Sequence, residues 1–227
     1  MTPTILLFDI DGTLVTGDGA GRRALQRVFD RRYGRPDALE RIVFHGATDR
    51  AIMREALAAL GVAHDDAHVD AVLAEYVEVL PSLVGPAGYR AQRGVVALLE
   101  ALVGRPGLVL GLGTGNIEPG ARVKLTPPDL NRFFPFGGFG SDAEDRAELL
   151  AIGAERGAAA LGVPRDACRV CVIGDTLRDV QAAHAIGATC VAVATGGNTV
   201  DELRASGAEV VVAHLDDPAV LPALTRS

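Results

Sequence analysis

Cysteine is scarce in this chain, and its three copies lack the spacing of a metal or disulfide framework. Cys168 and Cys171 form a C-x-x-C pair, but residues 169–173 are a predicted strand. Residues three apart on a strand point to opposite faces, so the two thiols cannot grip one metal ion. Cys190 has no partner pair, and no pair of histidines is spaced for zinc. We therefore predict thiols that simply pack in the core or on the surface.

Positive charge and long apolar runs are also in short supply. The chain has 22 Lys and Arg against 29 Asp and Glu, a net charge of -7, so no global positive field would attract nucleic acid. The first apolar run reaches Asp9 within five residues and follows no basic segment, which argues against a signal peptide or a membrane span. We expect a cytoplasmic protein, monomeric or homodimeric, that binds neither nucleic acid nor membrane.

The order of apolar segments predicts an α/β fold. The 227 residues are 48% hydrophobic and 22% charged, enough for one good-sized domain or a domain with an insert. Expected strands and helices alternate in the second half, which implies βαβ units and a parallel sheet whose strands end at one ligand-binding edge. The expected strands are 108–112, 136–139, 169–173, 189–193 and 209–212, and the expected helices are 118–125, 143–161, 179–186 and 199–205.

Residues 16–90 break this alternation, because they contain no convincing strand. They predict three helices, at 21–33, 48–60 and 66–83, and Thr48 is a suitable N-cap for the second. We therefore expect an α/β core formed by residues 1–15 and 91–227. The helical segment 16–90 would leave the sheet beside the first strand's carboxyl end, which is the position of a lid.

Two carboxylates follow the first expected strand. The apolar run Ile5–Phe8 ends in Asp9, and Asp11-Gly12 comes directly after it. A carboxylate at such a strand end costs free energy unless a cation or hydrogen bonds compensate it. The pair therefore indicates a divalent metal, a nucleophile or an acid/base pair, whereas Asp-Gly alone would also suit a hairpin turn.

A glycine-rich segment follows the strand expected at 108–112. The hydroxyl of Thr114, the amide of Asn116 and the backbone N–H groups at Gly115 suit phosphate oxygens at a strand-to-helix junction. A dinucleotide or S-adenosylmethionine loop would instead follow the first strand and have an acid at the tip of the next one. No acid stands there before Asp142, and the chain has no Gly-Lys-Thr/Ser for a P-loop.

A second acidic pair follows the strand expected at 169–173. Asp175 ends that strand, and Asp179 lies one helical turn further on the same side. Asp179 alone could be an acid favoured by a helix N-terminus. Two acidic pairs at the edge of one parallel sheet, with no histidine nearby, point to magnesium.

Together these segments resemble the four motifs of the haloacid dehalogenase superfamily, in the right order across almost the whole chain. The motifs are Asp9-x-Asp11-Gly12-Thr13-Leu14, the strand ending in Thr114, a basic residue before the fourth strand, and Gly174-Asp175-x-x-x-Asp179. The resemblance implies a Rossmann-like three-layer core with an inserted helical cap. The insert resembles the cap of the phosphoglycolate phosphatase-like and phosphoglucomutase-like branch, although Ala47 stands where that branch usually has arginine.

The resemblance also implies roles for individual residues in a magnesium-dependent phosphatase that acts on a small phosphorylated metabolite through an aspartyl-phosphate. Asp9 would be the nucleophile and Asp11 the acid/base, and magnesium would be held by Asp9, Asp175 and the backbone carbonyl of Asp11. Asp179 would orient Lys124 or a metal-bound water. The residues expected to bind substrate are Thr114, Gly115, Asn116, His45 and Thr48.

The third motif leaves its cation open. Lys124, the only lysine in the chain, and Arg146 both precede the fourth strand. A compact ammonium suits the bridging of a phosphate and a carboxylate, which favours Lys124, whereas Arg146 lies nearer the family position. A phosphomutase is the nearer rival function. A 2-haloacid dehalogenase, which would need no second Asp, and a catalytically silent binding protein are the more distant ones.

Overall fold

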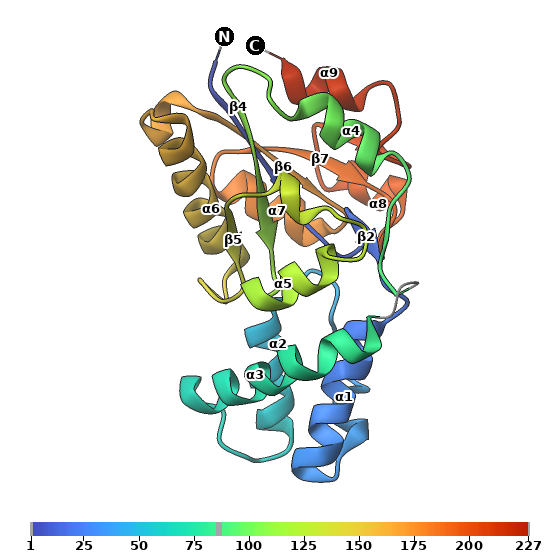
Figure 1. Ribbon diagram of the computed structural model, residues 1–227. Coiled ribbons are helices and arrows are strands. Elements are labelled where there is room, and N and C mark those ends of the chain that lie inside the picture. Colours follow the sequence, from blue (N-terminus) through green and yellow to red (C-terminus); the bar gives the residue numbers. More distant parts are fainter. Residues whose placement is uncertain (1, 85–87, 227) are drawn as a thin grey trace.

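The first strand of the sequence lies inside the sheet, where both of its faces are covered. The computed structural model describes residues 2–84 and 88–226 (Figure 1). Its main sheet has the order β5-β4-β1-β6-β7-β8, and every neighbouring pair is parallel, which confirms the predicted α/β fold. The strands are β1 (Thr4–Phe8), β4 (Leu108–Thr114), β5 (Gly137–Phe139), β6 (Arg169–Gly174), β7 (Thr189–Val193) and β8 (Val210–Val212).

The alternation of side chains along β1 feeds two separate apolar cores. Ile5 and Leu7 pack on one face of the sheet, and Leu6 and Phe8 pack on the other. The first face is covered by α6 (Arg146–Leu161), α7 (Leu177–Ala185) and α8 (Val200–Ala205). The second is covered by α4 (Val95–Leu102), α5 (Glu118–Leu125) and α9 (Val220–Thr225). This arrangement confirms the three-layer core.

Capping side chains explain why two helices begin away from their predicted starts. The helix α6 begins at Arg146 rather than at residue 143, because the Asp145 side chain accepts the backbone N–H of Glu148. The helix α7 begins two residues earlier than predicted, because Thr176 caps it. Short 3₁₀ turns occupy Pro36–Leu39, Asn131–Phe133 and Arg165–Ala167.

Three α-helices that follow β1 within residues 16–90 form the helical block, which Figure 1 shows at the end of the molecule away from both termini. They are α1 (Ala20–Tyr33), α2 (Asp49–Ala59) and α3 (Asp66–Leu83), and their spans closely match the predicted ones. They share an apolar cluster of their own, which includes Phe29, Met53 and Tyr76. Thr48 caps α2 as predicted, since its hydroxyl accepts the N–H of Ala51.

A small antiparallel pair, absent from the predictions, joins the two passages between the sheet and the helical block. It consists of β2 (Val15–Thr16) and β3 (Arg90–Ala91). Strands of two residues carry no readable periodicity, so they could not be predicted. The domain boundaries near residues 15 and 91 stay predictions, and this pair lies at both positions.

Two further features concern the cysteines and the helix lengths. All three thiols are free, and Cys171 packs in the core on the side of the sheet opposite that of Cys168 and Cys190. This confirms the packing role predicted for them. Among the described residues, every helix is too short or too polar to cross a lipid bilayer.

Candidate active site

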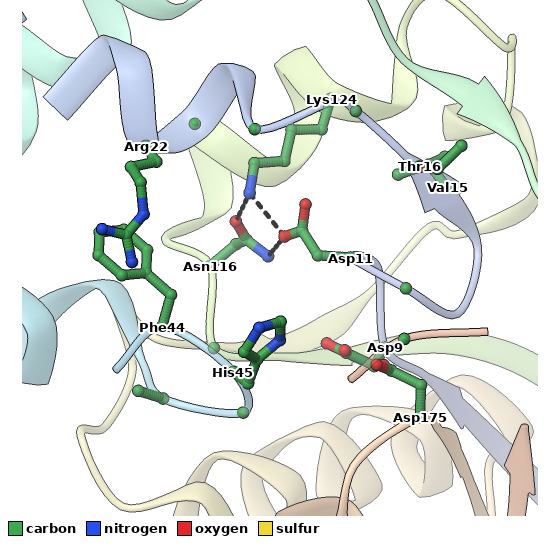
Figure 2. A pocket seen from close by; sticks show the side chains of 18 of the residues that line it. Asp9, Asp11, Val15, Thr16, Arg22, Phe44, His45, Asn116, Lys124 and Asp175 are labelled. Atoms are coloured by element: carbon green, nitrogen blue, oxygen red, sulfur yellow. Dashed lines mark hydrogen bonds and ion pairs between the residues drawn. The ribbon is translucent and has the colours of Figure 1, made fainter. Parts of the chain in front are cut away.

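Strand ends of the main sheet face the helical block across a cavity of about 440 Å³ (Figure 2). Asp9 and Asp11 reach it from the end of β1, and Asp175 reaches it from the end of β6. Phe44 and Tyr76 line it from the helical block. The site therefore lies where parallel strands end, as the topology of an open α/β sheet favours.

Three buried carboxylates gather at this edge of the sheet, and two of them, Asp9 and Asp175, line the cavity. Asp9, Asp175 and Asp179 have ligand oxygens within 4.8 Å of one another and exposed fractions of 6%, 2% and 0%. Asp175 is closely held, because the Thr13 hydroxyl donates to its Oδ1 at 3.0 Å. A Cβ added at Gly196 would lie 1.6 Å from Asp175 Oδ2, so only glycine leaves room for this carboxylate.

Arg146 connects two of these carboxylates. Its Nη2 lies 3.1 Å from Asp9 Oδ1, and its Nε donates to Asp179 Oδ1 at 2.8 Å. The other oxygen of Asp179 accepts the N–H of Thr176 at 3.0 Å and its hydroxyl at 2.7 Å, within the capping box of α7. Asp179 therefore contacts Arg146 and not Lys124, and the alternative role, in which it orients a metal-bound water, stays a prediction.

Charge in this cluster is incompletely balanced, since one guanidinium faces three carboxylates. Burial raises the pKa of Asp9 to about 6, and the negative charges of Asp179 and Asp11 add to this while Arg146 counteracts it. Burial and the charge of Asp9 also raise the pKa of Asp175 well above its usual value. A bound cation would relieve both carboxylates.

A second, separate group surrounds Asp11. Lys124 Nζ, on α5, donates to Asp11 Oδ2 at 2.6 Å and also to the amide oxygen of Asn116. The Asn116 Nδ2 donates to the same Asp11 oxygen at 2.9 Å, and Figure 2 shows the three side chains joined in this way. Burial disfavours the Lys124 ammonium, but Asp11 acts together with Tyr76, Tyr89 and Asp49 to outweigh this and to raise its pKa well above the usual value.

The glycine-rich segment after β4 supplies part of the cavity wall. Gly115 and Asn116, which were predicted to bind phosphate, line the cavity. The Thr114 hydroxyl is fully buried and accepts the Asn116 backbone N–H at 3.3 Å and its Nδ2 at 2.9 Å. In this structure Thr114 therefore braces Asn116.

The loop before α2 brings the helical block against this segment. A Cβ added at Gly115 would lie 2.4 Å from the carbonyl oxygen of Ala47, so the backbone segments at Gly115 and Ala47 are in close contact. His45 lines the cavity, as expected. The Thr48 hydroxyl donates to the carbonyl of Glu144 at 3.2 Å, so this residue links the helical block to the segment that carries Arg146.

Sequence reasoning missed several residues of the cavity wall. Tyr76 and Tyr89 line it beside Lys124, whose Nζ lies 5.9 Å from the Tyr89 ring centroid. Arg22 stacks on Phe44 at 4.0 Å, and two of its N–H groups donate to backbone carbonyls of the segment before Phe44. Tyr76 is one of the apolar-face residues of α3, and a periodic pattern cannot mark which member of such a face opens into a cavity.

Comparison with known proteins identifies one family over most of the chain. A family model for haloacid dehalogenase-like hydrolases matches residues 3–187. Phosphoglycolate phosphatase 1 of Pseudomonas aeruginosa is 30% identical over 226 residues, which is 95% of this chain and 78% of that protein. The match therefore extends over both the sheet and the helical block.

Solved structures have the same fold. CbbY from Rhodobacter sphaeroides in complex with phosphate aligns with a TM-score of 0.70 at 18% identity and covers 97% of this chain and 99% of its own. A hydrolase from Pseudomonas syringae aligns with a TM-score of 0.66 at 23% identity and covers 100% and 97%. At these identities the likeness establishes the shared architecture.

Proposed function

Because the chain belongs to the haloacid dehalogenase-like hydrolase family, we propose that it is a magnesium-dependent phosphatase that cleaves a small phosphate monoester through an aspartyl-phosphate. One observation carries this proposal. Asp9, held by Arg146, and Asp11, held by Lys124, face one cavity at the end of the same strand. The relative from Pseudomonas aeruginosa, which is named for phosphoglycolate, supports a small phosphorylated metabolite as substrate.

The carboxylate cluster fits a magnesium ion by the chemistry of its donors. All of its candidate ligands are hard oxygens, which magnesium prefers. Both oxygens of Asp179 are already bonded to Arg146 and Thr176, which leaves Asp9 and Asp175 as the carboxylates that would hold the ion. The backbone carbonyl of Asp11 remains the third ligand that we propose. Magnesium bound there supplies positive charge beside the nucleophile and the phosphoryl group.

The chemistry then divides between the two aspartates of β1. The Asp9 carboxylate attacks phosphorus, and the bond between phosphorus and the ester oxygen breaks, with Asp11 giving its proton to the leaving oxygen. In the second step Asp11 takes a proton from water as that water attacks the phosphorus of the aspartyl-phosphate. Inorganic phosphate leaves, and both aspartates return to their starting forms.

Positive and polar groups around Asp9 would hold the phosphoryl oxygens. Arg146 contacts Asp9 directly, and Gly115 lines the cavity beside it. Lys124 is the second buried positive charge of the cavity, and it contacts Asp11 and Asn116 instead of Asp9. These groups act by position and charge, which are the main contributions that a protein makes to phosphoryl transfer.

We propose that the helical block, residues 16–90, is a cap that excludes bulk water during the reaction. Its loop at His45 and Ala47 lies over the cavity and against Gly115, and Thr48 links it to the segment before Arg146. The cavity volume of about 440 Å³ suits a small substrate. Three free thiols are consistent with the cytoplasm as the site of action.

A direct assay tests the proposed function. Purified protein would be incubated with a panel of small phosphate esters, with and without magnesium, and released phosphate would be measured. We expect magnesium-dependent release that the Asp9→Asn variant lacks. Release of halide from a 2-haloacid with no phosphate release, or no activity toward any ester, would contradict the proposal.

A further inference from the structure

The site contains two buried cations, and the structure gives them different partners. Arg146 is bonded to Asp9 and Asp179 on one side of the cavity floor. Lys124 is bonded to Asp11 and Asn116, and among the described residues Asp11 is the only carboxylate with which it forms an ion pair. Arg146 therefore pairs with the proposed nucleophile, Asp9, whereas Lys124 pairs with the proposed acid/base, Asp11.

We infer that Lys124 is a positioning residue for Asp11: with Asn116 it holds the Asp11 side chain toward the ester oxygen that leaves. This inference rests on the proposed phosphatase function and adds a role for the only lysine of the chain. Arg146 then remains the cation that accompanies Asp9 and the phosphoryl group.

The surroundings of Lys124 favour a partner within the protein over a substrate atom. Its side chain is only 7% exposed, and two of its three N–H donors are used by Asp11 and Asn116. The Tyr89 ring lies 5.9 Å from its Nζ, and a Cβ added at Gly21 would lie 3.6 Å from the same atom. The ammonium is thus enclosed by protein on several sides.

Asp11 needs such support more than Asp9 does. Its side chain is 47% exposed, so burial alone does not fix its orientation, whereas the side chain of Asp9 is 9% exposed. Lys124 and Asn116 both donate to the same oxygen, Oδ2, which leaves Oδ1 as the atom that can carry the proton to the leaving group. Asn116 is itself fixed, because the buried Thr114 hydroxyl accepts two of its N–H groups.

The role predicts a dependence on the leaving group that a purely structural role would not produce. Phenyl phosphate and p-nitrophenyl phosphate have similar shapes, but only the first needs a proton on its leaving oxygen. The Lys124→Met variant should lose at least about tenfold more kcat/KM on phenyl phosphate than on p-nitrophenyl phosphate, since general acid catalysis contributes roughly 10²–10⁴-fold. The ratio between the two esters does not depend on the folded fraction of the sample.

Three further variants serve as controls. Asp11→Asn should show the same selective loss, and Asp11→Asn combined with Lys124→Met should lose no more selectivity than Asp11→Asn alone, because both changes remove one function. Arg146→Met should slow both esters by a similar factor. Asn116→Ala, which removes the second donor to Asp11 and leaves the ammonium in place, should repeat the selective loss in a milder form.

The outcomes separate this inference from the proposed function. If the wild-type protein hydrolyses neither ester with magnesium, the phosphatase proposal fails and the role of Lys124 fails with it. If the wild type is active but Lys124→Met slows both esters alike, or its loss multiplies with that of Asp11→Asn, Lys124 acts on the phosphoryl group and the inference alone is overturned. Should Lys124→Met not fold, an equal loss on both esters in Asn116→Ala would overturn it.

Discussion

Among single residues, Asp9 matters most for the proposed phosphatase mechanism. Asn at this position keeps the size of the side chain and a hydrogen-bond acceptor for Arg146, which lies 3.1 Å away, but it cannot form an aspartyl-phosphate. The Asp9→Asn protein should therefore fold normally and lose at least about a thousandfold in kcat. Turnover with a magnesium-stimulated ester and thermal unfolding measure the two properties, and retention of more than a tenth of wild-type kcat contradicts the assignment.

Asp49, which lies at the contact between the helical block and the sheet, should make the free energy of unfolding depend on pH. Burial raises its pKa from 3.8 to about 6, although the charge of Lys124 and the N–H of Ile117 partly offset this. The folded state therefore binds this proton more tightly than the unfolded state, so the contribution of Asp49 to stability is lost as pH rises from about 4 to 6. Asp49→Asn should remove that decline.

Denaturant unfolding of the wild type and of Asp49→Asn at several pH values checks this expectation. The two free energies of unfolding should be similar near pH 4, and the variant should gain up to roughly 3 kcal/mol by pH 7, because one pKa unit corresponds to about 1.4 kcal/mol. A difference that stays constant with pH, or that shrinks as pH rises, would be inconsistent with a proton held by buried Asp49.

The placement of acidic residues at strand ends could be predicted from the sequence, whereas the basic residue that pairs with each of them could not. The positions of Asp9, Asp11 and Asp175 follow from where apolar strands stop. The pairing of Arg146 with Asp9 and of Lys124 with Asp11 depends on how α6 and α5 pack on opposite faces of the sheet, and that packing leaves no mark in spacing. For the same reason Tyr76 and Tyr89 could not be assigned to the cavity.

At the scale of elements, long periodic helices were predicted closely and short elements were not. The spans of α2 and α3 follow from capping residues and apolar stripes, which are local signals. The pair β2 and β3 and the short α4 and α9 escaped prediction, because too few residues carry each pattern. Tertiary contacts decide such elements.

Thr48 tests how the element α2 is joined to the core. Thr48→Ala removes both its N-cap bond to Ala51 and its bond to the carbonyl of Glu144, so the free energy of unfolding should fall by about 1–2 kcal/mol. Thr48→Ser keeps the hydroxyl and should retain most of that stability. Thr199→Ala, which removes the cap of α8 away from the cavity, is a matched control that should leave KM unchanged. If Thr48→Ala changes neither the free energy of unfolding nor KM, Thr48 does not link the helical block to the core.

For the molecule as a whole, bound magnesium should be required for activity and should also stabilise the folded state. Chelation with EDTA should abolish phosphatase activity, and magnesium should restore it. Because the ion binds the folded state alone, excess magnesium should raise Tm in the wild type and have little effect in Asp175→Asn. The Glu202→Gln variant, which alters the capping box of α8, is a control that should keep the full response to magnesium. Activity that is unchanged after chelation would contradict the magnesium site.

The central claim is a covalent phosphoryl group on Asp9, and chemical trapping tests it most directly. The wild-type protein would be mixed with a phosphate ester and magnesium, quenched and treated with borohydride, which reduces an aspartyl-phosphate to homoserine. Mass spectrometry of the peptide that contains residues 9 and 11 would then locate the change. We expect homoserine at position 9, only with ester present and not in Asp9→Asn. Turnover with residue 9 unmodified, or homoserine at position 11 instead of position 9, would contradict a phosphoryl group on Asp9.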